Sequence, residues 1–156
     1  MGLRENLQNE PVRDLNLRPA ITAKPEILVR EAVELMRGKR LGCLILVDDD
    51  QKPVGVFTEG MLRHLLAQNS RVVDDSVEQH MATQFPWVTP DDPVITVLEA
   101  MQIKNHRFVV VVDGDGKVKA LTGQKGLMEY IADYFPEQVL TQRGGAKAPI
   151  SEREGA

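Results

Sequence analysis

The sequence has almost no cysteine and no excess of basic residues. Cys43 is the only cysteine of the 156 residues, so no disulfide can form within the chain, as is usual in a reducing compartment. Lysine and arginine number 19 against 23 aspartates and glutamates, which gives a formal net charge of -4. Proteins that bind a phosphate backbone usually carry a basic stripe. The composition therefore argues against a nucleic-acid partner.

Long apolar runs are also absent. No stretch approaches the roughly 20 consecutive apolar residues that a membrane-spanning helix needs. The first ten residues, MGLRENLQNE, are polar and lack the apolar core of a secretion signal. Hydrophobic residues make up 42% and charged residues 27%, which is ordinary for a globular protein. We therefore expect a cytoplasmic protein without a membrane partner.

Residue groups typical of catalysis or of metal binding are missing as well. His64, His80 and His106 are dispersed through the sequence without metal-ligand spacing. Cys43 has no histidine and acid beside it in the sequence that would activate a thiol nucleophile. We therefore expect neither enzyme activity nor a bound metal ion.

What the sequence does contain is an internal repeat. LGCLILVDDDQKPVGVFT, residues 41–58, reads as a short apolar strand, an acidic turn, a second strand and a threonine that opens a helix. FVVVVDGDGKVKALT, residues 108–122, has the same order. The acidic segments lack the closing glutamate of a calcium loop, so tight turns explain them better. Each copy follows an amphipathic segment that ends in a methionine, Met36 or Met101, so a two-copy module is the unit of the fold.

Each copy is predicted to contain a helix before its apolar strand and another after its second strand. The first helix carries apolar residues at i, i+3, i+4 and i+7, which is the spacing of one buried face. The continuous apolar runs are typical of strands buried on both faces. Pro25 and Pro93 suit first helical turns, Asp92 is predicted to cap the second of these helices, and Gly38 to end the first. The predicted helices cover residues 25–37, from 58 onward, from 93 onward and 122–134, and the predicted strands cover 19–22, 44–47, 54–57, 85–88, 109–112 and 118–121.

One copy offers only about half of the core that a stable domain requires, and its small sheet would have helices on one face alone. Two copies packed sheet to sheet would bury that exposed apolar face around a pseudo-two-fold axis. Such packing leaves two equivalent clefts between the copies, where ligands favour binding. The same surfaces could pair two chains through an isologous interface.

The ordered series, occurring twice, resembles the tandem CBS-domain proteins, whose regulatory pair is also called a Bateman module. The segments that carry the resemblance are ITAKPEILVREAVELMRGKRLGCLILVDDDQKPVGVFT and HMATQFPWVTPDDPVITVLEAMQIKNHRFVVVVDGDGKVKALT. The resemblance implies an α+β fold, in which each copy is a β-α-β-β-α unit and the two copies intertwine. It also implies a homodimer, an adenosine-containing ligand between the copies, a regulated protein partner and no catalysis by the module. The predicted divisions are an N-terminal extension (1–11), repeat 1 (12–70), repeat 2 (71–140) and a disordered tail (141–156).

The resemblance also implies which residues line the clefts. In the family, the first strand of each copy, the start of the buried strand, and a Gly-x-x-Thr/Ser-x-x-Asp element before the last helix surround the ligand. The aspartate of that element takes both ribose hydroxyls, while the threonine and the helix N-terminus meet phosphate. The expected binding residues are Ile21, Thr22, Arg40, Thr58, Val88, Thr89, His106, Arg107, Phe108, Thr122 and Lys125.

The sequence departs from the family pattern at both aspartates. Aligning Thr58 with Thr122 places Met61 and Lys125 where the carboxylates would be. Losing a bidentate ribose contact weakens nucleoside binding by roughly two to four orders of magnitude. Lys125, at a helix start, could instead attract a phosphate. Thr58 and Thr122 could equally serve as helix caps alone.

Two functions therefore stay open from the sequence. The first is a sensor module that binds AMP, ADP, ATP, NAD or S-adenosylmethionine and signals to a partner. Binding is expected to be selective for one cleft, and the missing aspartate counts most against the cleft of Met61. The second is a ligand-independent module that dimerises and docks on another protein, as the missing aspartates would allow.

Overall fold

The computed structural model describes residues 2–104 and 106–134, and the tail predicted at 141–156 lies outside them. Repeat 1 contains β1 (Ile21–Ala23), α2 (Val29–Lys39), β2 (Cys43–Val47), β3 (Pro53–Thr58) and α3 (Glu59–Gln68). Repeat 2 contains β4 (Trp87–Val88), α4 (Ile95–Lys104), β5 (Phe108–Val112), β6 (Val118–Gly123) and α5 (Gln124–Tyr134). Helix α1 (Leu3–Asn9) and the 3-10 turns η1 (Val12–Asp14), η2 (Ser70–Asp74) and η3 (Val77–Gln79) lie outside these units.

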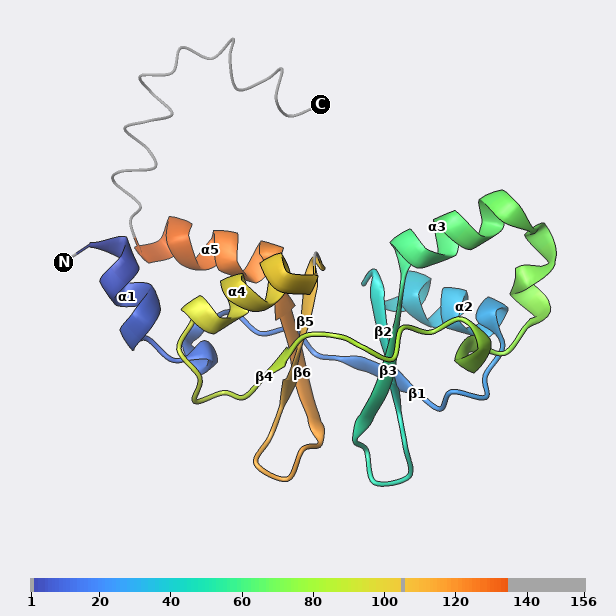
Figure 1. The fold of residues 1–156 in the computed structure, drawn as a ribbon, viewed down its shortest axis with the longest axis horizontal. Helices are drawn as coiled ribbons and strands as arrows, with labels where there is room; N and C mark the ends of the chain where they lie inside the picture. The colour runs from blue at the N-terminus through green and yellow to red at the C-terminus, as the bar shows by residue number, and fades with distance from the viewer. Residues whose placement is uncertain (1, 105, 135–156) are drawn as a thin grey trace, which may run out of the picture.

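The two repeats form two three-stranded sheets, in the orders β1-β2-β3 and β4-β5-β6. In each sheet the first pair of strands is parallel and the second antiparallel. The sheets stand side by side in the centre of Figure 1, and the helices lie outside and above them. The predicted α+β fold of two β-α-β-β-α units is therefore confirmed.

The central strands β2 and β5 are buried on both faces, as their apolar runs predicted. Alternate side chains of a strand point to opposite faces. Leu44 and Leu46 accordingly pack under the helices of repeat 1, while Ile45 and Val47 belong to a cluster that includes Val110 of β5. That shared cluster is the sheet-to-sheet core, and it holds the two repeats together.

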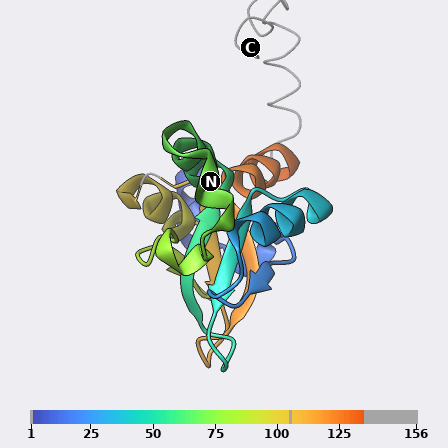
Figure 2. The same cartoon turned by 90° about the vertical axis from the view of Figure 1, so that its right-hand side faces the viewer.

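The acidic segments are tight turns, as predicted. The Asp48 carboxylate accepts hydrogen bonds from the amides of Asp50 and Lys52, at 2.9 and 3.0 Å. Asp113 repeats the arrangement in the second hairpin, where the Lys117 amide is the main reason that the pKa of the Asp113 carboxyl lies below its usual value. The two hairpin tips lie together in Figure 2, where the Val118 amide donates to the Gln51 carbonyl at 3.0 Å.

The repeats exchange the segments that precede them. In repeat 1, the amide of Val29 donates to Asp75 of the linker, at 2.9 Å. In repeat 2, the amide of Val94 donates to Glu10, at 2.8 Å, so the N-terminal segment of the chain packs on the C-terminal repeat. Figure 1 shows this crossing, with α1 beside α4 and α5. These backbone hydrogen bonds show the intertwining of the two copies that the family resemblance implies.

These exchanged segments explain why the starts of two helices were wrongly predicted at the prolines. The carbonyl of Pro25 accepts from Glu78, which ties up the backbone that would otherwise form the first helical turn, and α2 begins at Val29. Asp92 does not cap α4. Its carboxylate accepts from the Thr89 amide at 2.8 Å, its carbonyl accepts from the Val12 amide of the N-terminal segment at 2.7 Å, and α4 begins at Ile95.

The predicted end of α2 is also wrong. The helix continues through Gly38, and the left-handed residue that closes it is Arg40, with φ 54°. Residues other than glycine are uncommon in this left-handed conformation.

Cys43 is buried in the sheet-to-sheet core, 1% exposed, as predicted for a small core residue. Burial raises the pKa of its thiol to about 12, so the thiol is protonated and unreactive at neutral pH. Within the described part of the chain, none of the helices has the length and apolar character needed to cross a bilayer.

Candidate ligand-binding clefts

The pairing of residues along the antiparallel strands shows which residues of the two copies correspond, and it corrects the alignment made from the sequence. Each antiparallel ladder is irregular at the same place, just before the turn. Matching Val47 to Val112 at that point makes Thr58 the counterpart of Gly123, and not of Thr122. The alignment of Thr58 with Thr122 is therefore wrong by one residue. The residue directly before α5 is Gly123, so the capping role considered for Thr122 is wrong.

In the corrected register, the positions that the family fills with aspartate are taken by Met61 and Gly126. Lys125 becomes the counterpart of Gly60, in the first turn of its helix. The family's aspartate is therefore missing from both copies in either alignment, as the sequence predicted.

A first cleft, here called the Thr58 cleft, lies between the repeats at the start of α3. Its volume is about 590 Å³, within the ~300–1,000 Å³ of typical small-molecule sites. Both repeats contribute to its walls, and basic side chains predominate among its polar ones. It is lined by Gly42, Thr58, Glu59, Gly60, Met61, Arg63, His64, Leu65, His80, His106, Arg107 and Phe108.

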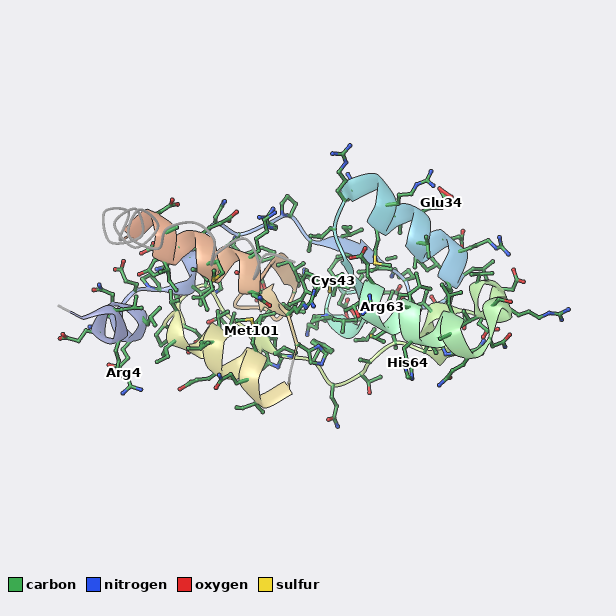
Figure 3. The ribbon with its side chains drawn as sticks, turned by 90° about the horizontal axis from the view of Figure 1, so that it is seen from above. Arg4, Glu34, Cys43, Arg63, His64 and Met101 are labelled. Atoms are coloured by element: carbon green, nitrogen blue, oxygen red, sulfur yellow. The ribbon has the colours of Figure 1, made fainter. Side chains whose placement is uncertain are left out.

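Thr58 caps α3 at the base of this cleft. Its hydroxyl oxygen accepts from the Met61 amide at 3.2 Å, which leaves the hydroxyl proton available to a ligand. The Glu59 side chain folds over Gly42, where a Cβ would stand 2.3 Å from the carboxylate oxygen. In Figure 3, Arg63 lies close to the middle of the molecule, on the helix that starts here.

Replacing Thr58 by alanine is expected to lower the free energy of unfolding by about 1 kcal/mol, because the Met61 amide loses its capping oxygen. Chemical denaturation measures the loss. Thr58→Ser keeps the oxygen and should retain most of the stability. An equal loss in both variants would contradict the capping role.

A second cleft, here called the Lys125 cleft, lies at the start of α5. Its volume is about 130 Å³. Arg107 and Phe108 line both clefts, so the two share a wall. The Lys125 cleft is lined by Asn16, Arg18, Arg40, Leu41, Arg107, Phe108, Leu121, Thr122, Gly123, Gln124, Lys125 and Gly126.

The structure brings seven of the eleven predicted binding residues to these walls and places four elsewhere. Ile21 and Val88 are buried in the cores under the helices, because strands β1 and β4 turn them inward. Thr22 and Thr89 do not line either cleft. The seven lining residues are Arg40, Thr58, His106, Arg107, Phe108, Thr122 and Lys125.

Sequence reasoning missed the residues that reach the clefts from the exchanged segments. Arg18 pairs with Leu121 across a backbone bridge, and Ala82 pairs with Val56 in the same way. These bridges bring Arg18 and His80, which precede the first strands, to the clefts. The only signal in the sequence was their position just upstream of each copy.

No group of three or more histidine, cysteine, aspartate or glutamate side chains among residues 2–104 and 106–134 is placed to hold a metal ion. The residues that line the two clefts supply hydrogen-bond donors, cationic side chains and apolar walls, which can surround an anionic organic molecule.

Comparison with protein families identifies the module. The CBS domain model matches twice, at residues 12–68 and 76–133. The chain therefore belongs to the CBS-domain family and carries the domain as a tandem pair, as the repeat predicted. CBS domain pairs are in general regulatory modules without catalysis of their own.

Two curated relatives show the range of lengths in which the module occurs. An uncharacterized 17.7 kDa protein of Acidianus ambivalens is 27% identical over 115 residues, which cover 74% of this chain and 69% of that protein. A homoserine O-acetyltransferase of Methanohalobium evestigatum is 27% identical over 82% of this chain, which spans only 25% of that enzyme. The relatives named as enzymes are larger proteins that carry the domains alongside others.

Solved structures share the fold. The CBS domain pair of protein MJ0100, in complex with 5′-methylthioadenosine and S-adenosyl-L-methionine, is 27% identical with a TM-score of 0.72, covering 80% of this chain and 97% of that one. A CBS domain protein from Pyrobaculum aerophilum, complexed with AMP, is 26% identical with a TM-score of 0.66, covering 72% and 86%.

Proposed function

We propose that this CBS pair is a non-catalytic sensor that binds an adenosine-containing nucleotide in the Thr58 cleft and passes the binding event to a partner protein. The observation that carries the proposal is the cleft itself. It has a volume of about 590 Å³, is walled by both repeats, and joins a helix N-terminus to basic side chains. Helix N-termini and arginines are favourable surroundings for phosphate.

In this proposal Thr58 and the first turn of α3 meet the phosphate, with Arg63 and Arg107 supplying positive charge. Glu59 is the acidic residue of the cleft wall, two positions before Met61. We propose that Glu59 takes the ribose hydroxyls in place of the missing aspartate. The coupling to a partner would run through the shared sheet-to-sheet core, since a ligand that contacts both repeats biases their relative position.

The bound ligands of the two neighbours support the chemistry. One has 5′-methylthioadenosine and S-adenosyl-L-methionine bound to its CBS pair, and the other has AMP. All three compounds contain adenosine. At 26–27% identity the neighbours make adenosine compounds the first ligands to test on this chain.

The test is a thermal-shift panel of AMP, ADP, ATP, NAD and S-adenosylmethionine at millimolar concentration. A ligand at a hundred times its dissociation constant adds about 2.7 kcal/mol of stability, which raises the unfolding midpoint of a domain of this size by about 5–10 °C. We expect one or two of the five to shift the midpoint selectively. A flat panel would contradict the proposal.

Glu59→Gln is expected to weaken the ligand found in that panel by about tenfold or more, because a charged hydrogen-bond acceptor is removed. The variant should also stop distinguishing AMP from 2′-deoxy-AMP, measured by calorimetric titration. Glu99→Gln, at an exposed position of α4, is the matched control and should bind as the original chain does. Unchanged discrimination in Glu59→Gln would assign the ribose to another group.

A second candidate, a ligand-independent docking module, is favoured by the absence of the family's aspartate from both copies, at Met61 and Gly126. The expected homodimer belongs to either function, and light scattering on the purified chain measures it. The cytoplasmic location and the identity of a regulated partner stay predictions.

A further inference from the structure

The start of α5 differs from the start of α3 in having no side-chain cap. Thr58 satisfies an amide of α3, whereas the residue before α5 is Gly123, which has no side chain to offer. The Gln124 amide donates to the Arg107 carbonyl at 3.0 Å. The following amides of the first turn, at Lys125 and Gly126, are donors of the kind that a helix leaves unsatisfied. These donors lie in the wall of the Lys125 cleft.

A second, independent feature of this cleft is the Thr122 hydroxyl. The side chain is 4% exposed, and its oxygen has no hydrogen-bond partner among the described residues. Leaving a buried polar group unpaired is costly, so such a group calls for an explanation. Gly126 keeps the space beside it open, because a Cβ at that position would stand 2.8 Å from the hydroxyl oxygen.

The charges around these donors are positive. Arg40, Arg107 and Lys125 line the cleft, and no ion pair is formed by any of them with the described carboxylates. Arg18 is the exception, since it pairs with Glu129 at 3.2 Å. Arg40 reaches the cleft from the left-handed position that ends α2. Unpaired cations are thus concentrated in this cleft although the chain as a whole carries a net charge of -4.

The volume of the cleft fits a compact anion better than a nucleoside. Its volume of about 130 Å³ is less than half of the ~300 Å³ at which ordinary ligand sites begin. We propose that the Lys125 cleft is a separate site for a compact tetrahedral oxyanion of the phosphate class, held by the amides at the start of α5, the Thr122 hydroxyl and the Lys125 ammonium. The site does not require that a nucleotide bind in the Thr58 cleft.

The proposal is tested by following backbone amide chemical shifts of the whole chain at constant ionic strength. The probes are inorganic phosphate, adenosine and ATP, added separately. We expect phosphate to move the amides of residues 122–126 saturably while adenosine leaves them in place. Signals of residues 58–61 report the Thr58 cleft in the same spectra, so failure of the nucleotide proposal is seen separately.

Three outcomes would overturn the proposal. They are no saturable response to phosphate, a response of residues 122–126 to adenosine, and a response of these residues to ATP but not to phosphate. The last result would mean that the anion is recognised only as part of a nucleotide.

Two variants assign the residues. Lys125→Gln should weaken phosphate binding about tenfold or more, since the site loses its charged donor. Lys119→Gln removes the same charge at an exposed position of β6 and should leave phosphate binding unchanged. Thr122→Val keeps the shape of the side chain and should weaken phosphate binding. It should not lower the unfolding midpoint, because the hydroxyl has no hydrogen-bond partner among the described residues. Unchanged phosphate affinity in both variants would contradict the assignment.

Discussion

Replacing Gly123 by alanine is expected to lower the free energy of unfolding by about 3 kcal/mol or more. Gly123 has φ 154°, a conformation that residues with a side chain rarely adopt. A Cβ there would stand 2.0 Å from the carbonyl oxygen of Arg107, which is backbone and cannot simply rotate away. The strand end and the start of α5 would have to separate. Denaturant unfolding measures the loss.

Gly114→Ala is the matched control for this variant. Gly114 lies in the second hairpin turn, and a Cβ there would have no atom within 4 Å. Its replacement should change stability by no more than about 0.5 kcal/mol. Equal stability of the two variants would contradict the close approach of the Arg107 carbonyl to Gly123.

Phe57→Ala is expected to cost about 3–5 kcal/mol, measured in the same way. Phe57 is 0% exposed and is the largest of the fully buried side chains in the core under α2 and α3. Its removal leaves a cavity that the surrounding core residues fill only in part. Phe57→Leu should recover much of the loss, since it restores most of the volume.

The counterpart of Phe57 in repeat 2 is Thr122, which provides an internal comparison. Thr122→Ala removes little volume and no hydrogen bond within the described chain, so it should cost far less than Phe57→Ala. Similar losses at the two positions would contradict the absence of a hydrogen-bond partner for the Thr122 hydroxyl.

The sequence predicted the repeats, the central strands and the turns because each has a local cause. Short apolar runs such as residues 44–47, followed at once by a turn, are typical of strands buried on both faces. The aspartates Asp48 and Asp113 close the turns through their own carboxylates. These signals depend on residues close together in the chain. Because the same pattern occurs twice, it also predicted that the two sheets pack against each other.

The helix starts could not be predicted in the same way because distant segments determine them. Pro25 has the residue type of a first helical turn, yet its carbonyl is occupied by Glu78. Intrinsic preference is a weak prior where tertiary hydrogen bonds compete. Arg18 and His80 were missed for a related reason, since each reaches its cleft only after the chain has crossed to the other repeat.

The lengths of the two hairpins distinguish Thr58 from Thr122 in the sequence itself. Both are threonines at the end of a strand, and the match of residue type concealed a difference of one position. Counting from the turns, Thr58 comes ten residues after Asp48, and the tenth residue after Asp113 is Gly123. The distinction matters, because it separates a capped helix start in the Thr58 cleft from an uncapped one in the Lys125 cleft.

The most direct test of the central claim, that the Thr58 cleft holds a nucleotide, is to map AMP on the chain by amide chemical shifts. We predict saturable changes at Gly42, at residues 58–61 and at Arg107, with the hairpin tips at residues 48–52 and 113–117 unaffected. Changes confined to other surfaces, or none with AMP or any other member of the panel at millimolar concentration, would contradict the claim and leave the docking module as the function to pursue.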